Sequence, residues 1–310
     1  MEPGWYHSAI LGCRKAILAA VIALAGPGAL VTPASAPAAS TDVYRGPGAW
    51  IDIFDSSMLA NAAATVDQLS LNGVRTIYVE TANYTNPRHG SIAYPLGISA
   101  LLDAAHAKGL KVIAWYLPGF LNRKRDLRRS LAAVRFTTLA GNRFDSFALD
   151  IEANRVRRIA TRNKRAVSLS KRIRAAVGRY YPLGAIVPDQ RSTSVSLPSM
   201  WPRFPYPRLR PIYDAFLPMS YSSLRGRGAT FAYAYTRANV QFLRAATHDP
   251  TLPVHVIGGL ASKLSASEDA AVVQAALDEG TLGASFYKLR GSSSGEWQTL
   301  SDGFGEEFTL

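Results

Sequence analysis

The sequence predicts an α/β fold, a single (β/α)8 TIM barrel that occupies residues 41–310. From residue 49 onward, short runs of β-forming residues alternate with amphipathic helical patterns, which is typical of repeated βα units around a parallel sheet. The chain has 310 residues, and the 270 that follow residue 40 are close to the roughly 250 of a typical (β/α)8 barrel. This alternation and this length favour one large domain.

Eight of the runs are predicted strands, and eight units can close into a ring that leaves no exposed sheet edge. The predicted strands span residues 49–54, 75–80, 111–117, 146–152, 183–187, 215–221, 254–258 and 283–288. Helical patterns lie between them, over residues 59–71, 98–108, 159–177, 234–246 and 267–279. Gly73 and Gly109 follow two of these helices, where a C-cap needs positive φ, and Ser267 is suited to begin another.

An open, doubly wound sheet is the alternative architecture. A dinucleotide-binding sheet of that kind carries a glycine-rich phosphate loop after its first strand. Here the segment Asp52-Ile53-Phe54-Asp55 stands at that place, so the sequence favours the closed barrel and predicts no nucleotide cofactor.

Residues 1–40 have the pattern of a secretory signal peptide followed by a small-residue linker. Arg14 and Lys15 precede an apolar stretch that a Gly-Pro-Gly sequence interrupts, so the stretch is shorter than the roughly 20 residues that span a bilayer. Sites of the Ala-x-Ala type follow, the first of them ending at Ala36. We therefore expect a secreted, extracellular protein whose mature form has no stable membrane span.

The chain is strongly basic, with a formal net charge of +13, and much of the charge lies in a helical pattern over residues 155–179. Such a surface could bind nucleic acid by releasing counterions. A protein outside the cell meets other polyanions, however, so we expect no nucleic-acid partner and predict anionic cell-wall polymers as neighbours, with the protein associated with the cell wall. A surface that is basic only for solubility is an equal alternative.

The fourth predicted strand carries two acids close together. In Phe147-Ala148-Leu149-Asp150-Ile151-Glu152, the period of two places Leu149 and Ile151 on one side and Asp150 and Glu152 on the other. Active sites of these barrels form at the carboxyl ends of the strands, so the two acids should enter the mouth. Their repulsion and partial burial should raise one pKa, and glycosidic-bond cleavage uses such a protonated acid beside an ionised one. A structural ion pair or a helix cap is the other interpretation.

Other strand ends supply further candidates for contacts with a substrate. Carboxylates and tyrosines suit a polyhydroxylated ligand, because acids accept its hydroxyls and rings cover its C–H faces. These candidates are Asp52, Asp55, Glu80, Tyr116, Asp189, Tyr221 and Tyr287. Trp201, in the proline-rich region 191–213, could form a sugar-stacking wall or could instead anchor its own loop.

Two other chemistries find little support. The pattern Gly291-Ser292-Ser293-Ser294-Gly295 matches a nucleophile elbow, but it follows the last strand with no histidine after it, so we interpret it as a flexible turn. Histidines are scattered rather than clustered with acids, so no metal ligand set is predicted. If two carboxylates act together, Glu80 or Asp189 is the expected partner of Glu152.

The residues Asp150-Ile151-Glu152, preceded by Asp145, resemble the acidic signature of family 18 glycoside hydrolases, the chitinase-like barrels. Met219-Ser220-Tyr221 resembles the Met-x-Tyr that those enzymes carry on the sixth strand. This resemblance implies that Glu152 is the general acid, that Asp150 steers the acetamido group of the substrate, and that Tyr221 contacts the same group.

The sequence departs from that family at three places. Ala148 stands where an inward Asp is expected, Ser222 stands where Asp follows the Tyr, and residues 114–119 replace the Ser-x-Gly-Gly of the third strand. Over residues 49–288 the chain resembles the uncharacterised, exported, glycoside-hydrolase-like barrels of actinobacteria more closely.

These observations lead to two hypotheses. The first is a secreted glycoside hydrolase for a cell-wall or environmental polysaccharide or oligosaccharide, with Glu152 as the acid and Asp150 as its modulator. The alternative is a catalytically inactive barrel that binds glycans in the same mouth, which the replacements at Ala148 and Ser222 favour.

Overall fold

The computed structural model describes residues 39–86, 90–196 and 199–305. Residues 1–38, which hold most of the predicted signal segment, lie outside the described part, so the secretory signal stays a prediction. In the part of the chain that is described, no helix is both long enough and apolar enough to cross a membrane.

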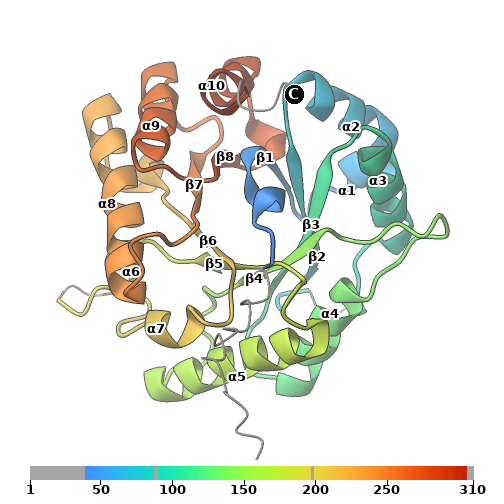
Figure 1. The fold of residues 1–310 in the computed structure, drawn as a ribbon, viewed down its shortest axis with the longest axis horizontal. Coiled ribbons are helices and arrows are strands. Elements are labelled where there is room, and N and C mark those ends of the chain that lie inside the picture. The colour runs from blue at the N-terminus through green and yellow to red at the C-terminus, as the bar shows by residue number, and fades with distance from the viewer. Residues whose placement is uncertain (1–38, 87–89, 197–198, 306–310) are drawn as a thin grey trace, which may run out of the picture. The chain divides into compact units, whose positions relative to one another are not determined.

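Eight parallel strands form the barrel, as the sequence predicts (Figure 1). They are β1 (Gly46–Ile51), β2 (Thr76–Asn83), β3 (Lys111–Leu117), β4 (Ser146–Asp150), β5 (Leu183–Val187), β6 (Ala215–Pro218), β7 (His255–Leu260) and β8 (Gly283–Tyr287). Neighbouring strands pair in the order β6-β5-β4-β3-β2-β1-β8-β7. Two isolated parallel bridges, Phe216 with Val254 and Met219 with Ile257, connect β6 to β7 and nearly close the ring.

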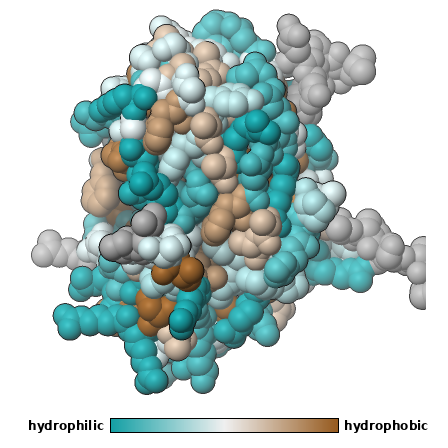
Figure 2. All heavy atoms as spheres, turned by 90° about the vertical axis from the view of Figure 1, so that its left-hand side faces the viewer, coloured by the Kyte–Doolittle hydropathy of each residue, from teal (hydrophilic) through white to brown (hydrophobic). Residues whose placement is uncertain are grey.

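Helices surround the strands (Figure 1), and on the side where α8 lies most outer residues are hydrophilic (Figure 2). The helices that follow the first four strands are α1 (Ser56–Ala60), α2 (Ala62–Leu71), α3 (Pro95–Ala107), α4 (Arg123–Val134) and α5 (Ile159–Val177). The later ones are α6 (Gln190–Thr193), α7 (Tyr206–Leu209), α8 (Ala229–Thr247), α9 (Ala266–Asp278) and α10 (Ser294–Phe304). Short 3-10 turns are η1 (Asp42–Tyr44), η2 (Ser222–Leu224) and η3 (Leu289–Gly291).

Two long helices, α4 and α10, lie outside the helical patterns named in the sequence, as do the short helices α6 and α7. The first turns of α4 are rich in charged residues. Helix α10 begins inside the segment interpreted as a flexible turn, because Ser293 and Glu296 form a reciprocal capping box there. A second capping box joins Ser265 to Glu268, so α9 is capped by Ser265 and not by Ser267.

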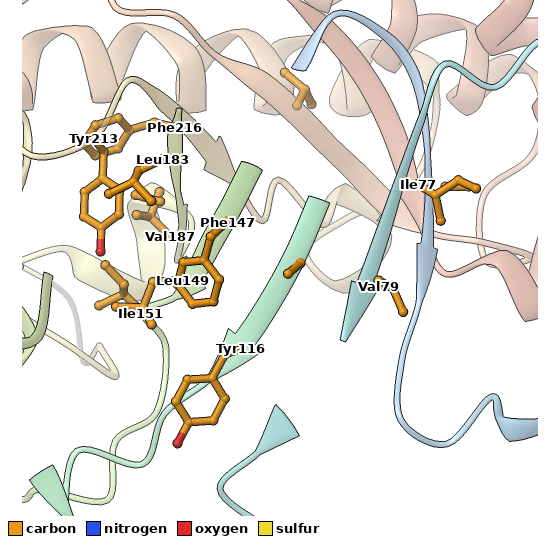
Figure 3. Close-up of a cluster of buried hydrophobic side chains, with 14 of the residues drawn as sticks. Ile77, Val79, Tyr116, Phe147, Leu149, Ile151, Leu183, Val187, Tyr213 and Phe216 are labelled. Atoms are coloured by element: carbon orange, nitrogen blue, oxygen red, sulfur yellow. The ribbon is translucent and has the colours of Figure 1, made fainter. Parts of the chain in front are cut away.

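The strands divide the core into two layers. Side chains that point outward pack under the helices, and Figure 3 shows Phe147, Leu149 and Ile151 in this outer layer. Side chains that point inward form a second cluster, which includes Trp50 and Trp115. Ala148 belongs to this inner cluster, so the alternation predicted for the fourth strand is correct.

Polar groups and a 3-10 turn fill the N-terminal end of the barrel. Tyr44, in η1, is fully buried, and its hydroxyl lies 2.6 Å from the Ser146 hydroxyl. His255 lies between the Tyr44 carbonyl, 2.8 Å from Nδ1, and the Ser285 hydroxyl, 3.0 Å from Nε2. Burial lowers the pKa of His255 to about 4, so this histidine is neutral and structural. The floor of the barrel is therefore closed, and a ligand must enter from the opposite end.

Close backbone approach at this floor requires glycine at position 283. A Cβ there would lie 2.2 Å from the Gly46 carbonyl oxygen, across the β1–β8 pair. We predict that Gly283→Ala lowers the free energy of unfolding by about 2 kcal/mol or more, because backbone atoms cannot yield as a flexible side chain can. Urea denaturation followed by circular dichroism measures the change.

Gly295→Ala is the matched control. The nearest atom to a Cβ at position 295, apart from its chain neighbours, is 3.8 Å away, and the residue lies in the first turn of α10. We expect this variant to be neutral or more stable by up to about 1 kcal/mol, since alanine favours the helix. Equal destabilisation by both substitutions would contradict the proposed close packing at Gly283.

Candidate active site

A pocket of about 180 Å³ lies at the carboxyl ends of the strands, where active sites of this fold form. Three acids, six aromatic or amide side chains and five aliphatic ones line it. They are Glu80, Asp150, Glu152, Trp50, Asn83, Trp115, Tyr221, Tyr287, Phe54, Leu117, Ile186, Met219, Ile257 and Leu260. All eight strands, or the residues directly after them, contribute to this wall, so the ring of strands itself assembles the pocket.

Asp150 and Glu152 emerge on the same side of β4, toward the pocket, as the strand period predicts. Asp150 is 6% exposed, and its Oδ1 has no hydrogen-bond partner among the described residues. Glu152 is partly exposed. No salt bridge links either carboxyl to a described lysine or arginine, so the pair is not a structural ion pair within that part of the chain.

Burial and mutual repulsion favour the protonated forms of these two acids. Desolvation is the main cause that raises the pKa of Asp150 well above its usual value, and the charges of Glu152 and Glu80 add to it. Desolvation also raises the pKa of Glu152. Because the two groups titrate together, the pair holds a proton at a pH where isolated carboxyls are ionised.

Glu80, at the carboxyl end of β2, is the third acid of the pocket. Its Oε2 accepts a hydrogen bond from the Ile53 amide at 3.0 Å, and its Oε1 accepts one from Asn83 Nδ2 at 2.8 Å. Burial raises its pKa to about 8, although these two hydrogen bonds oppose the shift. Glu80 is thus held in a fixed orientation, facing the same space as Asp150.

Beside the pocket, Asp52 and Asp55 form an ion-paired group with Lys288. The Lys288 ammonium lies 2.6 Å from Asp52 Oδ2 and 3.2 Å from Asp55 Oδ1. The Tyr287 hydroxyl donates to Asp52 Oδ2 at 3.1 Å, which orients the Tyr287 ring at the pocket wall. Asp52 and Asp55 therefore support the wall, and neither lines the pocket itself.

Aromatic rings form much of the remaining wall. Tyr221 and Tyr287 lie with their ring centroids 6.2 Å apart, and the Trp50 ring packs edge-on against Trp115 at 5.9 Å. Trp115 Nε1 is buried and has no hydrogen-bond partner among the described residues. The pocket wall thus contains two buried polar atoms that are unpaired among the described residues, a donor on Trp115 and an acceptor on Asp150.

Three residues predicted at the mouth lie elsewhere, because their side chains point outward from the strands or loops. Tyr116 is buried beneath α4, where its hydroxyl donates to Asp126 at 2.7 Å (Figure 3 shows its ring in the outer layer). Asp189 accepts from Tyr235 at 2.6 Å and pairs with Arg225 at 2.8 Å. Tyr116 and Asp189 do not line the pocket, so the prediction that they contact a substrate there is wrong.

Trp201 is the third such residue. It has no exposed surface, and its Nε1 donates to Asn163 Oδ1 at 2.6 Å. The Arg162 guanidinium lies 4.8 Å from its ring, and Phe120 and Phe204 contact its edges. Trp201 therefore anchors the 191–213 region, the second of the two interpretations, and is not a sugar-stacking wall.

Besides the aliphatic residues of the wall, the sequence analysis missed four aromatic or amide residues of the pocket, Trp50, Phe54, Asn83 and Trp115. The signal for Trp115 was present in the strand period. It pairs in register with Ala148, which faces inward, whereas Tyr116 pairs with Leu149, which faces outward. The search for polar residues at strand ends chose Tyr116, whereas the alternation of side chains along the strand directs its neighbour Trp115 into the barrel.

Comparisons with known proteins agree with this architecture. No family model matches the sequence, and no curated protein matches it in sequence. Among solved structures, the endo-β-1,4-mannanase from Thermotoga petrophila superposes with a TM-score of 0.64 at 11% identity, over 86% of this chain and 78% of the mannanase. The family GH18 chitinase from Cycas revoluta superposes with a TM-score of 0.59 at 11% identity, over 84% of this chain and the whole of the chitinase. The chain thus has a glycoside-hydrolase-like (β/α)8 fold.

The raised pKa of Glu80 predicts a pH-dependent stability. The folded protein keeps the Glu80 proton up to about pH 8, whereas the unfolded chain releases it near the usual value of 4.5. The folded state then binds more protons between these values, so the free energy of unfolding should fall as pH rises from 5 to 8. Glu80→Gln should reduce this fall by at least about 1 kcal/mol, measured by urea denaturation at both pH values.

Glu279→Gln is the control, because Glu279 pairs with Arg237 and Arg244 away from the pocket. Its pH dependence should match that of the wild type. If Glu80→Gln also keeps the wild-type dependence, Glu80 is ionised in the folded protein.

Proposed function

We propose that this protein is a secreted glycoside hydrolase that cleaves a polysaccharide or oligosaccharide at the barrel mouth, with Glu152 as the general acid. The observation that supports this most is the cluster of three pocket acids, Glu80, Asp150 and Glu152, whose pKa values burial raises and none of which pairs with a described cation. Acids in such surroundings stay protonated near neutral pH, as cleavage of a glycosidic bond requires.

The three acids differ in what they can reach. Glu152 is partly exposed, so a glycosidic oxygen can approach it, and the raised pKa supplies a proton for that oxygen as the C–O bond breaks. Asp150 lies beside it, and its charge modulates how firmly Glu152 holds that proton. An ionised carboxylate can then stabilise the cationic sugar and accept a proton from the attacking water.

Glu80 is the expected second carboxylate, because Asp189, the other candidate partner of Glu152, lies outside the pocket in its contacts with Tyr235 and Arg225. Since burial raises the pKa of Glu80 to about 8, Glu80 acts as a carboxylate only in the fraction of molecules that has lost this proton. The hydrogen bonds from Ile53 and Asn83 keep Glu80 in place before a substrate binds, which reduces the reorganisation needed during the reaction.

The aromatic wall supports a carbohydrate as the ligand. Tyr221, Tyr287 and Trp115 can cover the C–H faces of a sugar ring, while the acids accept its hydroxyls. The neighbours in structure include an endo-β-1,4-mannanase, a chitinase and an exo-β-1,4-mannosidase, so β-linked neutral glycans and amino-sugar glycans are the first substrates to test.

Glu152→Gln tests the assignment. We expect it to lower kcat at least about 100-fold with little change in KM, since the amide keeps the shape of the side chain but cannot donate the catalytic proton. The assay measures reducing ends released from β-linked glycans. Wild-type activity should persist toward neutral pH and fall as pH rises through the raised pKa of Glu152.

Glu279→Gln, made away from the pocket, should retain wild-type kcat. If Glu152→Gln cleaves every active glycan at the wild-type rate, Glu152 is not the acid. If the wild type binds glycans but releases no reducing ends, the protein is the catalytically inactive glycan-binding barrel.

A further inference from the structure

The net charge of this protein comes from one segment. Residues 120–179 contain 17 of the 35 lysines and arginines but only 4 of the 22 acids, so this segment alone has a formal net charge of +13. The other 250 residues contain 18 basic and 18 acidic side chains and are formally neutral. A basic charge that served only solubility would have no reason to collect in one fifth of the chain.

Most of these cations are exposed and unpaired. Twelve of the seventeen are exposed, and none of the twelve forms a salt bridge with another described residue. They are Arg123, Lys124, Arg128, Arg135, Arg143, Arg155, Arg157, Arg158, Lys164, Lys171, Arg172 and Arg179. We call the surface that they form the basic face.

The basic face begins beside the pocket. Arg155, Arg157 and Arg158 belong to the loop that follows Glu152, at the carboxyl end of β4. The face continues over α4 and α5, which pack against each other (Figure 1). A strand that left the pocket over β4 would therefore meet first the cations of this loop and then those of α5 and α4.

A shallow groove of about 480 Å³ lies along α4 on this face. Lys124, Arg128 and Arg135 from α4 and Arg172 from α5 line it, together with the aliphatic side chains of Leu127 and Leu131. Cations beside an aliphatic surface suit a polymer that carries negative groups on an otherwise apolar ring face. Nine of the twelve exposed cations are arginines, whose planar fork matches a carboxylate in two parallel hydrogen bonds.

We infer that the basic face binds a polysaccharide strand that carries carboxylate groups. The binding of a polyanion follows from the charge and the groove alone, whereas the choice of a polysaccharide rests on the proposed function. Single-stranded nucleic acid fits less well, because its binding sites use aromatic rings as stacking platforms. None of the residues that line this groove is aromatic.

The test uses Glu152→Gln protein, so that binding is measured without cleavage, and polygalacturonate as the probe. We expect binding at 50 mM NaCl that weakens steeply by 300 mM, and no binding to neutral dextran. Adding Arg128→Gln, Arg135→Gln and Arg172→Gln should weaken binding about tenfold, since each exposed ionic contact contributes modestly.

The matched control adds Arg191→Gln, Lys263→Gln and Arg290→Gln, three exposed cations outside the segment, which lower the net charge equally. This control should bind within about twofold of the parent if placement of charge decides affinity. Equal losses in the two triple variants would overturn the inference, as would tighter binding of duplex DNA than of polygalacturonate.

The outcome is separable from the catalytic proposal. If only the groove variant loses binding, the result supports the basic face as a binding surface. This holds even if the wild-type protein cleaves no glycan, because a failure to cleave rejects only the proposed hydrolase. Conversely, glycan cleavage by a wild type that does not bind polygalacturonate rejects only the basic face as a binding surface.

Discussion

Closure of the strand ring is the constraint on which the site depends. In a closed barrel the side chains alternate strictly between a narrow interior and the layer beneath the helices. The strand register pairs Glu80 with Trp115 and Trp115 with Ala148, so these three side chains lie at one level inside the barrel. Asp150 follows one level higher, where the interior opens. Glu80 and Asp150 lie on one side of the pocket because β2 and β4 both pair with β3, although the two acids are 70 residues apart in the chain.

The same closure makes the acids costly to ionise. A polar group that is buried without a hydrogen-bond partner lowers the stability of the folded protein. Asp150 Oδ1 and Trp115 Nε1 are both buried and unpaired among the described residues. The outer layer of aliphatic and aromatic side chains, under the helices, supplies the stabilisation that offsets this cost. The apolar outer layer of the core thus stabilises a barrel whose pocket acids have raised pKa values.

Cations are distributed in a complementary way. Lys288 compensates Asp52 and Asp55 beside the pocket, and it thereby positions Tyr287, but no described cation pairs with Asp150 or Glu152. The unpaired cations lie instead on the basic face, in contact with solvent. The interior therefore favours protonated acids, while the exterior beside it attracts anions.

The sequence by itself determined the barrel, the inward direction of Asp150 and Glu152, and the outward direction of Leu149, because these follow from periods along the chain. It did not determine where Tyr116, Asp189 and Trp201 point, since polarity at a strand end says nothing about the side to which a side chain turns. Only the tertiary structure placed the Arg162 guanidinium against the Trp201 ring and joined Lys288 to Asp52. Contacts between distant segments depend on ring closure and strand register, which no local pattern records.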